Sequence, residues 1–238
     1  MRRFLVENGL SLFFVTILLA ALVGQSLAGL ADLNSQQVAA GLQTLTYGQY
    51  VTSSSFAVDV AENWQSEFLQ FTLYIVATVF LLQYGSSESK EPGQAGLESD
   101  AEQQVGEHAT STSPAWARVQ GWRLSVYSWS LTTVMTLIFL GSWLAQSIAG
   151  RAAYNEQQLQ QLEDPLSWPE YVASADFWSR SLQNWQSELL AVAAMAVFAV
   201  YLRQRGSPES KPVGAAHDST RGRELTAIGL ARRDNWPQ

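Results

Sequence analysis

Apolar and polar segments alternate along the chain, and four of the apolar segments are long. The first runs from Leu10 to Leu30 and is interrupted mainly by Thr16, Gln25 and Ser26. A helix needs about 20 predominantly apolar residues to cross a bilayer, and this segment is long enough. The pattern predicts four membrane-spanning helices, at about residues 10–30, 66–84, 124–148 and 187–204.

The first apolar segment also permits a second interpretation, a cleaved signal peptide. Arg2 and Arg3 precede it, and Ser26-Leu27-Ala28 has the small-x-small pattern of a cleavage site. The same pattern returns in mid-chain as Gln146-Ser147-Ile148-Ala149-Gly150, where no cleavage by signal peptidase is expected. We therefore expect the motif to mark the end of a membrane helix in both places.

An internal repeat relates the two halves of the chain. The pentapeptide Asn63-Trp64-Gln65-Ser66-Glu67 returns as Asn184-Trp185-Gln186-Ser187-Glu188, at an offset of 121 residues. When residues 5–93 are laid on residues 126–214 without a gap, 32 of 89 positions are identical. Self-similarity at a fixed period indicates duplication of a structural unit.

The polar segments show how the chain is organised around this repeat. The parts, in order, are repeat 1 (1–85), a linker (86–121), repeat 2 (122–205) and a tail (206–238). Because the linker and the tail have few large apolar residues, they cannot bury enough surface to offset the entropy of ordering. We therefore predict that both are disordered.

Lysine and arginine predict the orientation. The outer loop of repeat 1 (31–65) contains neither, and the outer loop of repeat 2 (151–186) contains only Arg151 and Arg180. The positive-inside rule then places both termini and the linker in the cytoplasm. Since both repeats insert the same way up, we predict an all-α membrane protein of four transmembrane helices, built as two parallel-repeat hairpins related by a pseudo-two-fold axis along the membrane normal.

Short polar residues predict where two of the helices begin. Ser53 and its two serine neighbours precede Phe56, and Asp176 precedes Phe177. Serine and aspartate are preferred N-cap residues. We predict that a single helix runs from each cap through the repeated pentapeptide into the following span.

Composition supports a lipid environment and narrows the chemistry. Only 15% of the 238 residues are charged, nine are Trp, and none is Cys. His108 and His217 both lie in polar stretches, so we expect neither a metal site nor a cofactor. The net charge of −7 argues against nucleic acid as a partner.

Small residues spaced by four predict close helix packing. Such spacing aligns them on one helix face, where another backbone can approach. They are Ala20, Gly24 and Ala28 in the first span, and Gly141, Ala145 and Ala149 in the third. Gln25 and Gln146 lie beside these stripes, where their amides could hydrogen-bond across an interface.

The repeated pentapeptide is the candidate polar site, with two interpretations. Asn63 and Glu67 are four residues apart, and so are Asn184 and Glu188. The two residues of each pair therefore share one face of their helix. If the carboxylates lie at membrane depth, they are candidates for a proton, cation or ligand site. If they lie at the interface, with Trp64 and Trp185 in the headgroup region, they belong to an anchoring belt.

No catalytic motif appears among the residues. A glycine-rich phosphate loop, a nucleophile elbow and a metal-binding helix pair are all missing from the sequence. Without histidine in the spans or outer loops, acid–base catalysis would fall to carboxylates alone. We therefore favour a protein that is not an enzyme.

Several short motifs of repeat 1 belong together. They are Arg3 followed by Glu7-Asn8-Gly9-Leu10-Ser11-Leu12, then Val23-Gly24-Gln25-Ser26-Leu27, Tyr47-Gly48-Gln49-Tyr50, Glu62 to Gln70, and Gly85-Ser86-Ser87-Glu88-Ser89-Lys90. With these motifs, repeat 1 resembles a bacterial family of small multi-pass membrane proteins whose domain has no known function. The resemblance covers residues 3–90 well and residues 123–214 more loosely. Repeat 2 departs at its start, where Ser128-Trp129-Ser130 replaces Glu7-Asn8-Gly9. The resemblance implies a bacterial integral membrane protein and supplies no activity.

Two functions follow as hypotheses. The first is a non-enzymatic scaffold or accessory subunit in the bacterial inner membrane, whose partners are the lipid bilayer and either a second copy or another membrane protein. The second is a small transporter or channel in which Glu67 and Glu188 form a pair at the outer mouth.

Overall fold

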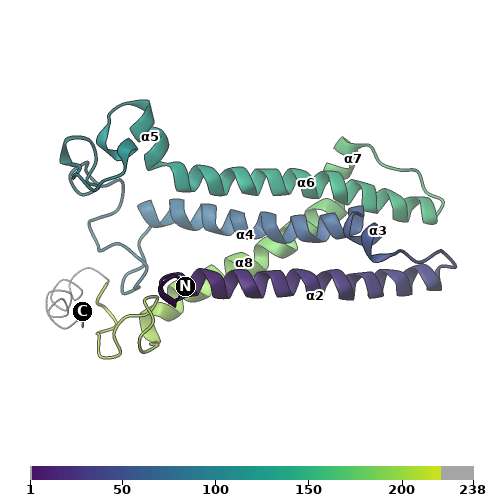
Figure 1. The fold of residues 1–238 in the computed structure, drawn as a ribbon, viewed down its shortest axis with the longest axis horizontal. Helices are drawn as coiled ribbons and strands as arrows, with labels where there is room; N and C mark the ends of the chain where they lie inside the picture. The colour runs from purple at the N-terminus through teal and green to yellow at the C-terminus, as the bar shows by residue number, and fades with distance from the viewer. Residues whose placement is uncertain (1, 221–238) are drawn as a thin grey trace. The chain divides into compact units, whose positions relative to one another are not determined.

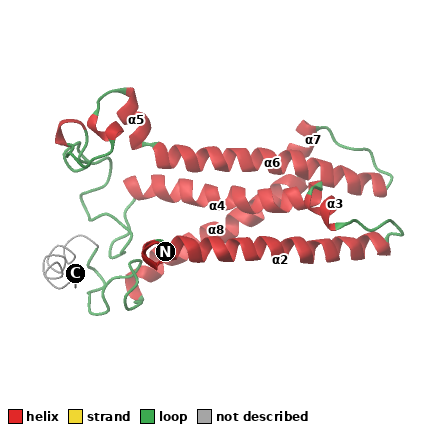
Figure 2. Cartoon of the chain, viewed as in Figure 1, coloured by secondary structure: helices red, strands yellow, loops and turns green. Residues whose placement is uncertain are grey.

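The computed structural model describes residues 2–220, and this part of the chain is helical throughout its regular structure (Figure 2). Within it lie eight α-helices, two short 3₁₀ helices and no strand. The all-α prediction is therefore confirmed. Residues 221–238, which include the four arginines predicted to lie in the cytoplasmic tail, are outside the described residues.

The helices of the two repeats have matching bounds (Figure 1). In repeat 1 they are α1 (Arg2–Glu7), α2 (Gly9–Ala39), α3 (Tyr47–Val51) and α4 (Ser54–Phe80). In repeat 2 they are α5 (Trp122–Ser128), α6 (Ser130–Gln160), α7 (Trp168–Val172) and α8 (Ala175–Tyr201). The 3₁₀ helices η1 (Gly106–His108) and η2 (Ala115–Arg118) lie between them. Each of α6, α7 and α8 begins and ends 121 residues after α2, α3 and α4.

The chain forms two compact units, which are described separately. The first joins Met1–Glu62 with Trp143–Trp178, so it contains α2, both short helices α3 and α7, and the later part of α6. The second joins Asn63–Ser142 with the chain from Ser179 onward, and it contains most of α4 and α8 together with the linker.

Two helices in the described part of the chain are long and apolar enough to cross a membrane. They are α2 and α6, each of 31 residues, with mean hydropathies of 2.1 and 1.5 over their most apolar stretches. Their apolar side chains are largely exposed, as in Leu10, Leu18 and Leu27 of α2. Such a surface suits lipid better than water.

Helix α2 extends further than the predicted span. It continues through Asn34 and Gln37 to Ala39, and residues 31–40 contain no proline or glycine that would end it earlier. There the chain leaves the helix in a Schellman motif: the N–H of Leu42 donates to the carbonyl of Gln37 (2.8 Å) and Gly41 adopts a φ of +74°. The predicted outer loop is thus partly helical.

Helix α6 ends in the same motif with a different residue. The N–H of Glu163 donates to the carbonyl of Gln158 (2.8 Å), and Leu162, at the position equivalent to Gly41, has a φ of +61°. A left-handed conformation is unfavourable for a side chain with a Cβ. Leu162 therefore carries backbone strain that Gly41 does not.

The starts of α4 and α8 confirm one predicted cap and correct the other. The hydroxyl of Ser53 accepts a hydrogen bond from the N–H of Phe56 (3.3 Å), as predicted. In repeat 2 the cap is Ser174, which accepts from Phe177 at the same distance. The prediction of Asp176 as cap is wrong, because this residue lies inside the first turn of α8. The predicted single helices through both pentapeptides are confirmed.

The segments that follow α4 and α8 fold into similar turns in the second unit. Backbone N–H groups of Gln83 and Gln204 donate to the hydroxyls of Ser89 and Ser210 at 2.8 and 2.9 Å. Lys211 is buried and donates to three backbone carbonyls. The predictions that residues 86–121 and 206–238 are disordered stay predictions.

Candidate functional site

The two repeated pentapeptides meet in the second unit through Gln65 and Trp185. The indole Nε1 of Trp185 donates a 2.7 Å hydrogen bond to Oε1 of Gln65. The Gln65 side chain is 0% exposed, and its Nε2 has no partner among the described residues. Helices α4 and α8 are thus joined by one buried polar contact at this level.

Glu67 and Glu188 lie on these helices two residues beyond Gln65 and three residues beyond Trp185. Glu67 is exposed, whereas Glu188 is partly buried. Glu188 is close enough to Glu67 for their negative charges to repel each other. The structure therefore brings together the two carboxylates of the candidate site, in different surroundings.

The asparagines of the pentapeptides make contacts within their own helices. The Asn184 side chain donates to the carbonyl of Arg180 (3.0 Å). The hydroxyls of Ser66 and Ser187 donate to the carbonyls of Asn63 and Asn184, both at 2.9 Å. These bonds stabilise the local helix. Within the two pentapeptides, the carboxylates of Glu67 and Glu188 are the ionisable groups.

Trp64 and Trp185 differ although they occupy equivalent positions. Trp64 is 44% exposed. Trp185 bonds Gln65 and also packs edge-on against Phe139, with ring centroids 6.5 Å apart. The exposed Trp64 suits a membrane interface, and the prediction that both residues are interface anchors stays a prediction.

The small-residue stripes lie on exposed faces of α2 and α6. A Cβ built on Gly24 or Gly141 would meet nothing within 4 Å among the described residues, and Ala20, Ala28 and Ala145 are exposed. Close packing at these stripes therefore stays a prediction. Gln25 is half-buried, and Gln146 is fully buried.

A different pair of glycines makes close contacts within the first unit. A Cβ on Gly29 would lie 2.0 Å from the Tyr50 hydroxyl oxygen, and one on Gly150 would lie 2.4 Å from that of Tyr171. Both tyrosines are buried, so each short helix docks its phenol against the preceding long helix. Sequence reasoning missed this role, although the recurrence of both residues at the repeat offset was a signal for it.

Asparagine side chains hold each outer loop to the helix before it. Asn34 donates to the carbonyl of Leu45 (3.0 Å) and accepts from its N–H (2.7 Å). Asn155 makes the same two bonds to Leu166, at 2.9 and 2.8 Å. Each asparagine thus satisfies both polar groups of one loop residue, eleven residues further along.

A third pair of contacts joins each long helix, α2 or α6, to the start of the short helix that follows it. The hydroxyls of Ser26 and Tyr47 lie 3.0 Å apart. In repeat 2, Trp168 Nε1 donates to the hydroxyl of Ser147, also at 3.0 Å. The identity of the partner differs, but the serine and the spacing of 21 residues are retained.

Acidic residues outnumber basic ones in the segments that follow the predicted first and third spans. Residues 31–62 contain three acidic and no basic residues, and residues 151–178 contain five acidic residues and Arg151. Burial, followed by the charges of Asp59 and Asp32, raises the pKa of the Tyr50 phenol. No group of three or more His, Asp or Glu side chains that could hold a metal ion occurs in residues 2–220.

The family model described as "Domain of unknown function (DUF6766)" matches residues 1–222. The chain belongs to this family. The match to DUF6766 agrees with the resemblance to a domain of unknown function, and the bacterial origin and multi-pass topology implied by that resemblance stay predictions. No curated protein and no solved structure matches the chain. For this DUF6766 chain, the argument about function therefore depends on its own residues.

Proposed function

We propose that this chain is a four-span integral membrane protein of the bacterial inner membrane that acts as a non-enzymatic scaffold or accessory subunit. One observation carries the proposal. The polar side chains shared by the two outer loops bond to the loops themselves, as Asn34 does to Leu45 and Asn155 to Leu166. Two loops that hydrogen bonds hold to the ends of exposed apolar helices suit a protein that presents surfaces to a partner.

The four-span arrangement requires α4 and α8 to cross the bilayer as well. Each has 27 residues and therefore a length of about 40 Å at 1.5 Å per residue. This exceeds the roughly 30 Å thickness of the hydrocarbon core. Their apolar ends, residues 66–80 and 187–201, would lie in lipid together with the helical turns before them, and the polar starts would lie outside it.

Cysteine labelling distinguishes four spans from two. The chain has no native cysteine, so Leu42→Cys, Leu97→Cys and Leu162→Cys, all at exposed positions, can be probed one at a time with a membrane-impermeant thiol reagent. With four spans, positions 42 and 162 are labelled on intact cells, and position 97 only after solubilisation. With α2 and α6 as the only spans, position 97 would be labelled together with position 42, which would overturn the arrangement.

The scaffold role is tested by purification in mild detergent. We expect a partner of fixed stoichiometry, either a second copy or another membrane protein, and we expect Gly24→Ile or Gly141→Ile to release it. Both variants should fold, because a side chain at either position meets open space. Ser11→Ile, at an exposed position on another face of α2, is the matched control. A wild-type chain that is monomeric and without a partner would overturn the proposal.

Glu67 and Glu188 favour a second candidate, a small transporter or channel. The partly buried Glu188 lies near the charge of another carboxylate, and ionisable groups at membrane depth mark ion or proton pathways. This candidate predicts a pH-dependent flux in liposomes that Glu67→Gln combined with Glu188→Gln abolishes. An unchanged flux in the double variant would exclude these residues.

A further inference from the structure

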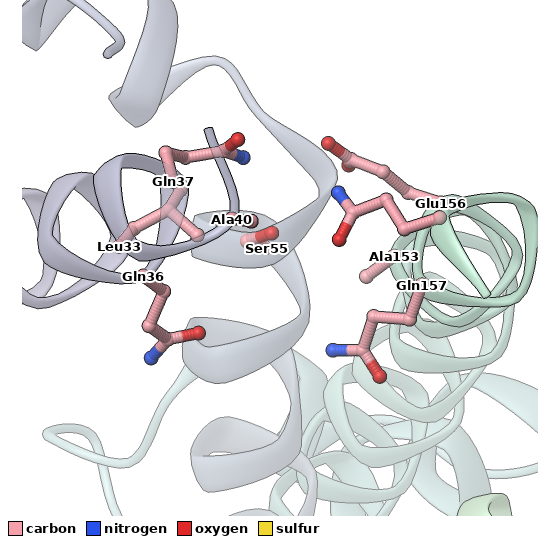
Figure 3. A pocket seen from close by; sticks show the side chains of 9 residues that line it. Leu33, Gln36, Gln37, Ala40, Ser55, Ala153, Glu156 and Gln157 are labelled. Atoms are coloured by element: carbon pink, nitrogen blue, oxygen red, sulfur yellow. The ribbon is translucent and has the colours of Figure 1, made fainter. Parts of the chain in front are cut away.

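A small cavity in the first unit lies between the ends of the two long helices (Figure 3). Its volume is about 70 Å³, which exceeds the roughly 10–15 Å³ that a single buried water requires. The cavity thus has room for a molecule of several non-hydrogen atoms. Its polar lining consists of Gln36 and Gln37 from α2, Ser55 from α4, and Glu156, Gln157 and Gln160 from α6.

Gln37 is the residue that marks this cavity as a site. Gln37 as a whole residue is only 8% exposed, and its amide makes no hydrogen bond with another described residue. In Figure 3 the side chains of Gln37 and Glu156 extend toward each other from opposite sides of the cavity. The Gln37 amide atoms open onto the cavity and are not fully buried, so a bound molecule can take the place of water as their hydrogen-bonding partner.

The remaining polar side chains are also available for binding. Glu156, Gln157 and Gln160 make no hydrogen bond with another described residue, whereas Gln36 is oriented by a 2.9 Å bond from its Nε2 to Asp32. The amides offer both donors and acceptors, and the Glu156 carboxylate offers acceptors only. The carboxylate requires N–H or O–H groups on the ligand, and the amide oxygens can accept from further groups of this kind.

The charge of the residues that line and surround the cavity indicates which class of ligand it binds. The cavity lining includes one carboxylate and no Lys or Arg, and the surrounding loops are acidic. An anion such as phosphate would be repelled, and a cation would be attracted. A metal ion that discards its water prefers several carboxylate ligands, whereas four amides and a single carboxylate match the directed donors of an ammonium group.

We propose that this cavity binds a small organic cation of the primary amine class, such as an amino alcohol. Its ammonium group donates to the Glu156 carboxylate and to amide oxygens, and its hydroxyl group bonds the Gln37 amide. The site lies beyond residue 30 of α2 and residue 148 of α6, outside the predicted spans. The proposal is independent of whether the chain acts as a scaffold or as a transporter.

Calorimetric titration of the purified full chain with ethanolamine at neutral pH tests the proposal. Loss of a neutral hydrogen bond from Gln37→Leu should weaken binding about three- to tenfold, and loss of the charged partner in Glu156→Gln should weaken it by about tenfold or more. Gln158→Leu is the matched control, because it changes the equivalent residue of repeat 2, which does not line the cavity. It should bind like the wild type.

A second readout separates loss of binding from loss of folding. Since Leu has nearly the volume of Gln and removes an unpartnered amide, Gln37→Leu should melt at a temperature equal to or above that of the ligand-free wild type. Choline, which has no N–H donors, should bind more weakly than ethanolamine. Equal binding by wild type and Gln37→Leu, absence of ethanolamine binding, or displacement of ethanolamine by an equal concentration of Mg²⁺ would each overturn the proposal.

Discussion

Trp185 and Gln65 are 120 residues apart in sequence, and a 2.7 Å hydrogen bond joins the indole nitrogen of one to the amide oxygen of the other. They occupy neighbouring positions of the same repeated pentapeptide, yet their counterparts differ: Trp64 and Gln186 are both exposed. Each copy of the duplicated motif therefore contributes a different residue to the contact. The contact between α4 and α8 is therefore asymmetric with respect to the two repeats.

Trp185→Phe should destabilise the fold. The substitution leaves the whole Gln65 amide buried without its donor, which costs about 1–3 kcal/mol for a buried polar group. The melting temperature in detergent should fall, whereas that of the control Trp64→Phe should change little, because exposed substitutions are usually within about 0.5 kcal/mol of neutral. Equal melting temperatures for the two variants would show that the hydrogen bond contributes nothing.

Gly29→Ala should also destabilise the fold, although alanine normally favours a helix. The added Cβ would lie 2.0 Å from the buried Tyr50 hydroxyl, and displacing a packed side chain costs about 1–3 kcal/mol. Gly24→Ala, five residues earlier on the same helix and facing open space, should instead gain roughly 0.5–1 kcal/mol from helix propensity. Chemical denaturation of both variants measures the difference, and Tyr50→Phe in the Gly29→Ala background should recover part of the loss. Two variants with shifts of the same sign would contradict the contact.

The helices could be predicted from the sequence more fully than the contacts between their side chains. The helix through Trp64 and Glu67 could be predicted because serine N-cap residues precede a continuous apolar pattern. The Asp176 cap was predicted wrongly because Ser174 and Asp176 are both good caps, and only the backbone shows which one is used. The position of Tyr50 against Gly29 could not be derived from local propensity, since their contact depends on how a loop folds back.

Leu162→Gly should stabilise the chain. Leu162 is 95% exposed and has a left-handed φ of +61°, so it contributes no packing that would offset a conformational strain of about 1 kcal/mol. Glycine relieves this strain at the end of α6, as Gly41 does at the end of α2. The reverse change, Gly41→Leu, should lower stability by a similar amount. Denaturant unfolding of the two variants should give shifts of opposite sign, and a Leu162→Gly variant less stable than the wild type would refute the assignment.

Glu170 should make α7 sensitive to acid, while the equivalent α3 should be insensitive. The Ser167 hydroxyl and N–H both donate to Glu170, at 2.5 and 2.8 Å, and these bonds lower the pKa of its carboxyl. A group whose pKa is depressed by folding adds stability above its unfolded pKa of about 4.3, and this stability is lost as the pH falls through the folded value. In α3 the same bonds go to the amide of Gln49, which does not titrate. Hydrogen exchange of α7 should therefore accelerate in acid relative to α3, and Glu170→Gln should remove the difference. If the acceleration persisted in Glu170→Gln, a different group would be responsible for it.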